Sequence, residues 1–386
     1  MPPHAVSWRF RSWWHPDFDK RGRRCYSRAV ERDLAPLLEE VVRGRFGSGV
    51  QVCRAAALAG DASTRRYVRL WLEGPAAPPS VVAMILADRG LALSSEELAV
   101  FKEPLRELPY VNVHRCLARL GVAIPALYAD ASDRGVLLLE DIGDTSLWDA
   151  VQGQPTERVR RLYEQAVDQL LLIQVEGTRH PDPGCIAFQQ AFDERLFTWE
   201  FEHFIEYGVE RRLGWPLPVQ DAAVLRACFA VIVKRLDAQP RCLNHRDFHS
   251  WNLFVQDDRI RVIDFQDALL APAAYDLATL LGDRATPQVV QPALESALLE
   301  YYRRRWHEVS GTELPAEDFT QTYFLCALQK ALKVVGRFYF IETVKKKPGY
   351  LRYIPSVVKQ IERILPRFPE LAEMSALLLR YLPRGA

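Results

Sequence analysis

Two short polar segments in the second half of the chain restrict its fold and its chemistry more than any other feature. Residues 243–252 read LNHRDFHSWN, and residues 263–267 read IDFQD. Asp247 stands five residues before Asn252, and Asp264 follows twelve residues after Asn252. We therefore expect a fold that brings two carboxylates and one amide together from separate stretches.

The residues between these segments predict a β-hairpin, because two short strand-like runs flank the polar residues 256–258. A three-residue loop at 257–259 would place Asn252 opposite Asp264. A two-residue loop at 257–258 would pair Asn252 with Ile263 instead. Either register puts Asn252 and Asp264 at the open end of the hairpin, next to the loop that carries Asp247.

This set of side chains suits phosphoryl transfer. A kinase needs a carboxylate to orient and deprotonate the attacking hydroxyl, and it needs oxygen ligands for Mg²⁺ on the nucleotide phosphates. Asp247 is the candidate base, and Asn252 and Asp264 are the candidate metal ligands. Taken singly, each segment is more typical of a turn or a helix cap, but their order and spacing together favour a kinase.

These residues resemble the aminoglycoside phosphotransferase and choline kinase group of the protein-kinase-like superfamily. Within it, the likeness is strongest to the bacterial N-acetylmuramate/N-acetylglucosamine anomeric sugar kinases. It rests on residues 60–69, 137–144, the two polar segments with 276–278, and 328–336. The resemblance implies an α+β bilobal fold, with a small lobe built on an antiparallel sheet and a large, mainly helical lobe. It also implies ATP in the cleft with Mg²⁺, and transfer of the γ-phosphate to an anomeric sugar hydroxyl.

The resemblance also implies where the nucleotide binds. The apolar strand that ends at Glu140 would lead into the hinge, where backbone groups near Glu140 and Ile142 hydrogen-bond adenine. Ser63, Arg65 and Arg66, in a loop of the small lobe, would contact the phosphates.

Other side chains would surround the catalytic loop. Asp276 would cap its backbone amides, His245 and His249 would support it, and Asp267 would bind or position the metal. Glu200 and His203 could border the acceptor pocket, although the polar pattern around both residues favours plain surface positions.

One departure from the protein-kinase pattern concerns a lysine. Protein kinases carry a Lys on the third strand of the small lobe, whereas the strand-like residues 81–86 contain none and the next is Lys102. The resembling sugar kinases also lack it. We expect another cation to neutralise the phosphates, and Arg65, Arg66 and Arg69 are the nearest candidates, with surface roles as the alternative.

Two hypotheses from other classes remain open. The absent strand Lys is compatible with a pseudokinase that binds nucleotide without turnover, although the three candidate site residues oppose it. His245 and His249, four residues apart, are compatible with a zinc-dependent hydrolase that also uses Asp247. The segment lacks an HExxH pattern, and no third ligand follows at a fixed spacing.

Composition limits partners and location. The net charge of +1, from 50 basic and 49 acidic residues, predicts no general attraction to nucleic acid or to an anionic membrane. Seven scattered cysteines without CxxC spacing predict reduced thiols. No apolar run is long enough for a bilayer or a signal peptide, so we expect a cytoplasmic protein.

The chain is expected to divide into three parts. Residues 1–30 form an extension in which aromatic and basic residues alternate, residues 31–139 a nucleotide-binding lobe, and residues 145–386 a catalytic and substrate lobe. Lysines between 330 and 347 make the last part locally basic, which favours an N-acetylated or carboxylate-bearing sugar as the acceptor. Aminoglycosides, choline and homoserine are alternative acceptors.

Overall fold

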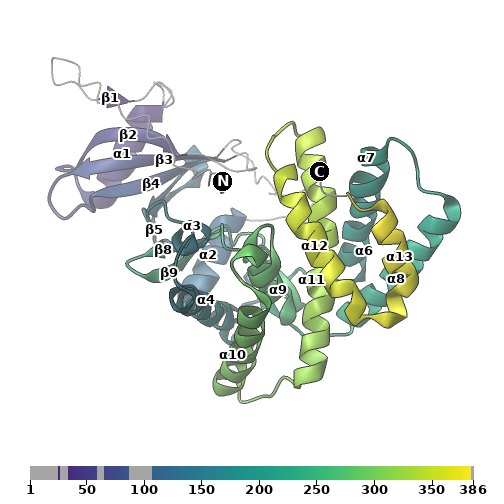
Figure 1. Ribbon diagram of the computed structural model, residues 1–386. Helices are drawn as coiled ribbons and strands as arrows, with labels where there is room; N and C mark the ends of the chain where they lie inside the picture. Colours follow the sequence, from purple (N-terminus) through teal and green to yellow (C-terminus); the bar gives the residue numbers. More distant parts are fainter. Residues whose placement is uncertain (1–24, 27–33, 59–64, 87–106, 384–386) are drawn as a thin grey trace. The chain divides into compact units, whose positions relative to one another are not determined.

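The computed structural model describes residues 25–26, 34–58, 65–86 and 107–383 (Figure 1). The chain divides into two compact units. The sheet unit contains the described residues among Met1–Arg89 together with Leu127–Asp141. The helical unit contains those among Gly90–Ala126 and Ile142–Ala386. Together they make the bilobal α+β fold that the sequence predicted.

The sheet unit is one helix and a six-stranded sheet with the order β1-β2-β3-β4-β6-β5. Its β1 pairs in parallel with β2, and the other neighbours are antiparallel. The elements are β1 (Cys25–Tyr26), α1 (Leu34–Phe46), β2 (Gln51–Leu58), β3 (Arg66–Glu73), β4 (Ser80–Ile85), β5 (Leu127–Ala131) and β6 (Val136–Glu140). Alternating apolar residues of the strands pack with the buried face of α1, and this forms the core of the unit.

The helical unit is built mainly from helices, with two small sheets among them (Figure 1). Its main helices are α2 (Pro109–Arg119), α3 (Leu147–Val151), α4 (Thr156–Leu171), α6 (Glu194–His203), α8 (Val219–Asp237), α9 (Ala274–Gly282), α10 (Pro292–Ser310), α11 (Ala316–Thr343), α12 (Ile354–Ile364) and α13 (Ala372–Tyr381). The shorter helices include α5 (Gly177–Arg179), α7 (Arg211–Leu213) and the π-helical segments η3 (Leu172–Glu176) and η5 (Phe204–Glu210). The two-stranded sheets pair β7 (Arg241–Asn244) with β10 (Leu269–Pro272), and β8 (Leu253–Gln256) with β9 (Arg259–Val262).

Residues 107–126 belong to the helical unit, although we expected residues 31–139 to form one lobe. The reason is local packing of α2. The side chain of Asn112 donates to the carbonyl of Gly184 (2.9 Å) and accepts from the amide of Ile186 (2.8 Å). The ring of Tyr110 packs on Phe265, with 4.8 Å between centroids. Most of the expected extension, residues 1–30, lies outside the described residues.

Within the described ranges, no helix combines the length and the apolar character that crossing a membrane would require.

Candidate active site

The β8–β9 hairpin has the shorter of the two expected loops. Gln256 pairs with Arg259, so the loop consists of Asp257 and Asp258. Both have positive φ (50° and 59°), as the two central residues of a type I′ turn require, and Asp tolerates this region better than most residues. The register therefore places Asn252 beside Ile263.

The hairpin brings the candidate ligands together at its open end. The amide of Ile263 donates to the carbonyl of Asn252 (3.0 Å). The side-chain amide of Asn252 lies 3.4 Å from Oδ2 of Asp264 and donates to the carbonyl of Asp247 (3.0 Å). Asp264 is exposed and has a φ of +65°. The side chain of Asn252 thus links the backbone of Asp247 to the carboxylate of Asp264 at the open end of the hairpin.

Asp276, in the first turn of α9, binds the backbone of the loop that carries Asp247. Its Oδ2 accepts hydrogen bonds from the amides of His245 (2.5 Å) and Arg246 (3.3 Å). Burial raises the pKa of this carboxyl to about 6, while His245 and the two amides oppose the rise. These bonds fix a backbone in which Arg246 adopts a φ of +81°.

Both histidines of the loop are buried. The ring Nε2 of His245 donates to the carbonyl of Ile263 (2.9 Å), which ties the loop to the hairpin. Burial and, after it, the charge of the nearby Arg284 lower the pKa of His249 to about 4. In the described part of the chain, no three His, Cys, Asp or Glu side chains gather as a metal site. The zinc-hydrolase hypothesis therefore gains no support.

Lys330, which projects from α11, is a member of the site that the two segments did not reveal. Its Nζ lies 3.0 Å from Oδ1 of Asp247. Burial raises the pKa of Asp247, but the charges of Lys330, Lys333 and Arg246 outweigh it and hold the pKa well below its usual value. Asp247 is therefore ionised at neutral pH, and 39% of its side chain stays exposed.

Gln266 was also not anticipated. It is buried, and its Nε2 donates to Asp264 Oδ1 (2.9 Å) and to Asp267 Oδ2 (3.1 Å). One amide thus orients both carboxylates of the second segment. Its place between two acidic residues in the sequence was the available signal.

Glu200 and His203 do not lie as the sequence suggested. Glu200 is fully buried, with its carboxylate 2.5 Å from Nζ of Lys333 and accepting from Nε2 of Gln329 (2.6 Å). It is neither a surface residue nor open to a ligand. His203 is also buried, and its ring stacks on Trp199 with 5.1 Å between centroids. Lys330 and Lys333 are likewise enclosed, so they do not add to a basic surface.

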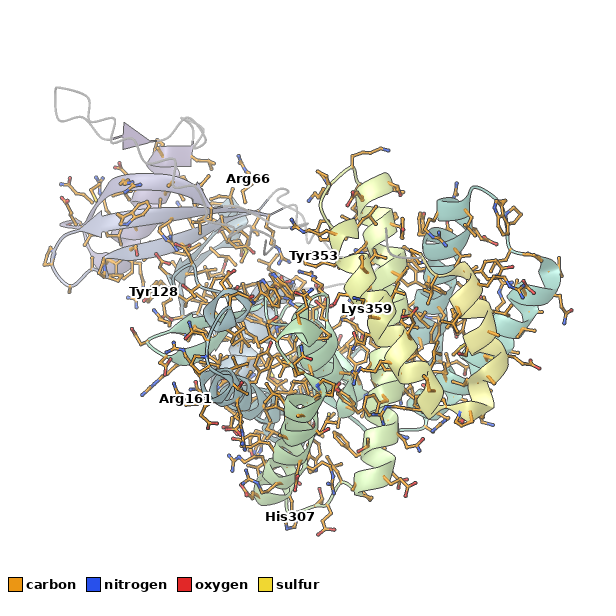
Figure 2. The ribbon with its side chains drawn as sticks, in the orientation of Figure 1. Arg66, Tyr128, Arg161, His307, Tyr353 and Lys359 are labelled. Carbon is orange, nitrogen blue, oxygen red and sulfur yellow. The ribbon has the colours of Figure 1, made fainter. Side chains whose placement is uncertain are left out.

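The residues expected to bind the nucleotide come from several separate segments of the chain. Ser63 lies outside the described residues. Arg66 begins β3 with an exposed side chain (Figure 2), and Arg65 precedes it. Glu140 ends β6 half-buried, and Ile142 is buried just beyond it.

Arg69, the third candidate to replace the strand lysine, is engaged within the sheet unit. Its Nε lies 2.7 Å from Oδ2 of Asp141, and the same oxygen accepts from the hydroxyl of Ser80 (2.6 Å). Arg69 of β3 thus binds Asp141, the residue that follows the end of β6.

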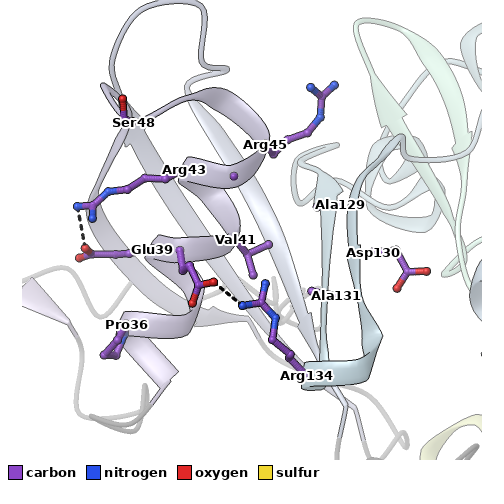
Figure 3. A pocket seen from close by; sticks show the side chains of 12 residues that line it. Pro36, Glu39, Val41, Arg43, Arg45, Ser48, Ala129, Asp130, Ala131 and Arg134 are labelled. Carbon is purple, nitrogen blue, oxygen red and sulfur yellow. Dashed lines mark hydrogen bonds and ion pairs between the residues drawn. The ribbon is translucent and has the colours of Figure 1, made fainter.

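A hollow of about 680 Å³ opens in the sheet unit between α1 and β5 (Figure 3). It contains none of the expected site residues. Glu39 pairs with Arg43 and Glu40 pairs with Arg134 at its rim. In each pair the two opposite charges compensate each other. We therefore assign the hollow no part in the chemistry.

Comparison with known proteins identifies the class. A family model described as the phosphotransferase enzyme family matches residues 54–312. The chain belongs to this family, and it is an enzyme that transfers phosphoryl groups.

Individual relatives narrow the comparison. An N-acetylmuramate/N-acetylglucosamine kinase from Pseudomonas aeruginosa is 32% identical over 329 residues, which cover 84% of this chain and 88% of that protein. A kinase of the same name from Neisseria meningitidis serogroup B is 27% identical and covers 83% of this chain and 88% of its own.

Solved structures share the fold. A choline kinase from Streptococcus pneumoniae superposes with a TM-score of 0.54 and 15% identity, covering 87% of this chain and 99% of its own. An ADP-bound aminoglycoside phosphotransferase gives a TM-score of 0.55 and 12% identity, covering 86% and 97%.

Proposed function

We propose that this enzyme transfers the γ-phosphate of ATP to a sugar hydroxyl, and that the acceptor is the anomeric hydroxyl of N-acetylmuramate or N-acetylglucosamine. The observation that carries the proposal is the meeting of Asp247, Asn252 and Asp264 at the end of one hairpin. The names of the relatives support the choice of sugar. Such a kinase would recycle cell-wall sugars in the cytoplasm.

Asp247 is proposed to accept the hydrogen bond of the attacking hydroxyl. Its carboxylate is ionised and partly exposed, so it can orient the hydroxyl and receive its proton as the new O–P bond forms. The loop backbone is fixed by Asp276, and Asn252 holds the carbonyl of Asp247 itself. The carboxylate is therefore preorganised for its task, which reduces the entropy lost on reaching the transition state.

The residues present fit Mg²⁺, which binds proteins through one or two oxygen ligands while retaining waters and substrate phosphates. The side-chain nitrogen of Asn252 faces two protein oxygens, which leaves its amide oxygen for a cation. Asp264 is exposed, and Gln266 orients its carboxylate. When bound, Mg²⁺ would neutralise charge on the phosphate oxygens.

The nucleotide is proposed to use backbone groups around Glu140 and Ile142 for adenine, and Ser63, Arg65 and Arg66 for phosphate oxygens. The presence of intact Asp247, Asn252 and Asp264 favours a working kinase over a pseudokinase.

Phosphorus NMR of the product tests the proposal. The enzyme, ATP and Mg²⁺ would be incubated with N-acetylmuramate or N-acetylglucosamine, in parallel with choline, homoserine and kanamycin. We expect a resonance of a phosphate on the anomeric carbon with one or both amino sugars. A phosphate on another hydroxyl would reject the anomeric assignment, and turnover of only a non-sugar would reject the sugar.

A further inference from the structure

Lysine is scarce in this chain, and its placement is selective. Nine of the 50 basic residues are lysines. Among the lysines that the structure describes, only Lys330 and Lys333 are buried, and they lie one turn apart on α11. Burying an ammonium group costs free energy unless it is paired. Two buried lysines on one helix therefore require partners.

Lys330 finds its partners in the catalytic loop. Besides the ion pair with Asp247, its Nζ donates to the carbonyl of Arg246 (3.4 Å) and lies 5.5 Å from the ring centroid of Tyr275. An ammonium has three N–H donors. The carbonyl of Arg246 and the carboxylate of Asp247 accept two of them.

Lys333 belongs to an adjoining network that fixes this part of α11. Its ammonium pairs with the fully buried Glu200 of α6, and Gln329 donates to the other carboxylate oxygen. These two contacts join α6 to α11 at residues 329 and 333, on either side of Lys330. The buried carboxylate thus compensates the ammonium charge of Lys333.

In the sheet unit, the cations proposed for the phosphates are the arginines Arg65 and Arg66. The described residues of the sheet unit contain no lysine, and β4 reads SVVAMI. Arg69, on the neighbouring strand, is paired with Asp141.

We infer that Lys330 is the positioning residue of the transfer reaction. Its ammonium holds the carboxylate of Asp247 in the orientation that receives the acceptor hydroxyl. The inference rests on the proposed kinase activity but not on the identity of the acceptor.

A double-mutant cycle tests the inference, using Lys330→Met, Asp247→Asn, the double variant and Lys330→Arg. Asp247→Asn should lower kcat by roughly 10²- to 10⁴-fold, and Lys330→Met by roughly 10²- to 10³-fold. KM for both substrates should change by less than about threefold, since binding is not lost. The double variant should be no slower than Asp247→Asn, because Lys330 acts through Asp247. Lys330→Arg, which retains a charge, should recover at least part of the rate.

Lys359→Met is the matched control, because Lys359 is an exposed lysine of α12 (Figure 2), and it should keep the wild-type rate. If Lys330→Met alone fails to fold, comparing the rate of the double variant with that of Asp247→Asn still tests the inference, because the double variant removes both charges of the pair. A double variant slower than Asp247→Asn by a further factor of about 100 or more would assign Lys330 an independent role. A wild-type rate in Lys330→Met would also overturn the inference.

Failure of the proposed function is recognised separately. A wild-type enzyme that phosphorylates another alcohol would reject the sugar assignment, and the same cycle would then be measured with that alcohol. A wild type inactive with every acceptor would overturn both proposals.

Discussion

The amide of Gln266 ties the two carboxylates of the second polar segment to each other. It donates to Asp264 and Asp267 and is almost fully buried. Residues that orient a metal ligand without touching the metal are typically worth a factor of about 10–100 in metal affinity or activity. Gln266 thus acts on the proposed metal through Asp264.

Gln266→Leu should therefore raise the Mg²⁺ concentration needed for half-maximal rate by about 10- to 100-fold. The substitution keeps the volume of the side chain and removes only its hydrogen bonds. Turnover measured over a Mg²⁺ titration provides the test. Gln220→Leu, on the exposed face of α8, serves as control and should leave the titration unchanged. An unaltered Mg²⁺ dependence in Gln266→Leu would exclude the orienting role.

His249 makes stability depend on pH. Its pKa is about 4 in the folded protein, because burial and Arg284 disfavour the imidazolium, against 6.5 when exposed. Between pH 6.5 and pH 4, the imidazole of His249 is protonated in the unfolded chain and neutral in the folded chain. The free energy of unfolding therefore falls as the pH falls from 6.5 towards 4. The loss amounts to about 2 kcal/mol between pH 7.5 and pH 5.

His249→Asn should reduce this fall, although it lowers stability at neutral pH. Urea midpoints of the wild type and the variant at pH 7.5 and pH 5 provide the measurement. The difference between the two midpoints should be smaller in the variant. Equal pH dependence in both proteins would show that His249 titrates normally.

At the scale of elements, the position of α11 depends on a close contact with η5. A Cβ on Gly336 would lie 2.8 Å from Cα of Phe204 and 2.9 Å from the carbonyl oxygen of His203. Because these are backbone atoms, the two segments would have to separate. Gly336 thus allows the approach that sets Lys330 against the catalytic loop.

Gly336→Ala should destabilise the protein by about 1–3 kcal/mol or more and should also slow turnover. Gly44→Ala is the matched control, since Gly44 lies in the last turn of α1 with nothing within 4 Å of a new Cβ. It should stabilise by about 0.5–1 kcal/mol. Thermal melting of both variants checks the prediction, and a Gly336→Ala protein as stable as the wild type would contradict the packing argument.

The sequence predicted elements better than it predicted contacts between them. The strands β2, β3, β4 and β6 and the β8–β9 hairpin follow from local patterns of apolar residues, whereas β1 and β5 do not. The hairpin register stayed undecided, because the residues around Asp257 fit either loop. The pair of Lys330 with Asp247 joins residues 83 positions apart, and no local pattern encodes such a distance. Glu200 looked like a surface residue for the same reason, since its partner lies on another helix.

At the scale of the whole molecule, the apolar strand that ends at Glu140 predicts a lobe boundary there, whereas the membership of α2 depends on tertiary contacts that the sequence does not show. The catalytic candidates Asp247, Asn252 and Asp264, and the supporting Asp276, all belong to the helical unit. The strand order of the sheet unit, in which β6 lies between β4 and β5, is likewise a long-range property that single-sequence patterns do not encode.

Binding of nucleotide with its metal should be visible as stabilisation of the whole protein. A ligand that binds only the folded state at 100 times its Kd stabilises by about 2.7 kcal/mol, which raises the apparent Tm by several degrees. We expect this rise with ATP and Mg²⁺ together, and a much smaller one when EDTA removes the metal. Asp264→Asn should abolish most of the rise while leaving the Tm without nucleotide nearly unchanged, because Asp264 is exposed and Asn tolerates its positive φ. An equal rise with and without EDTA would show that the nucleotide is held without metal, and the assignment of Asn252 and Asp264 as ligands would then be wrong.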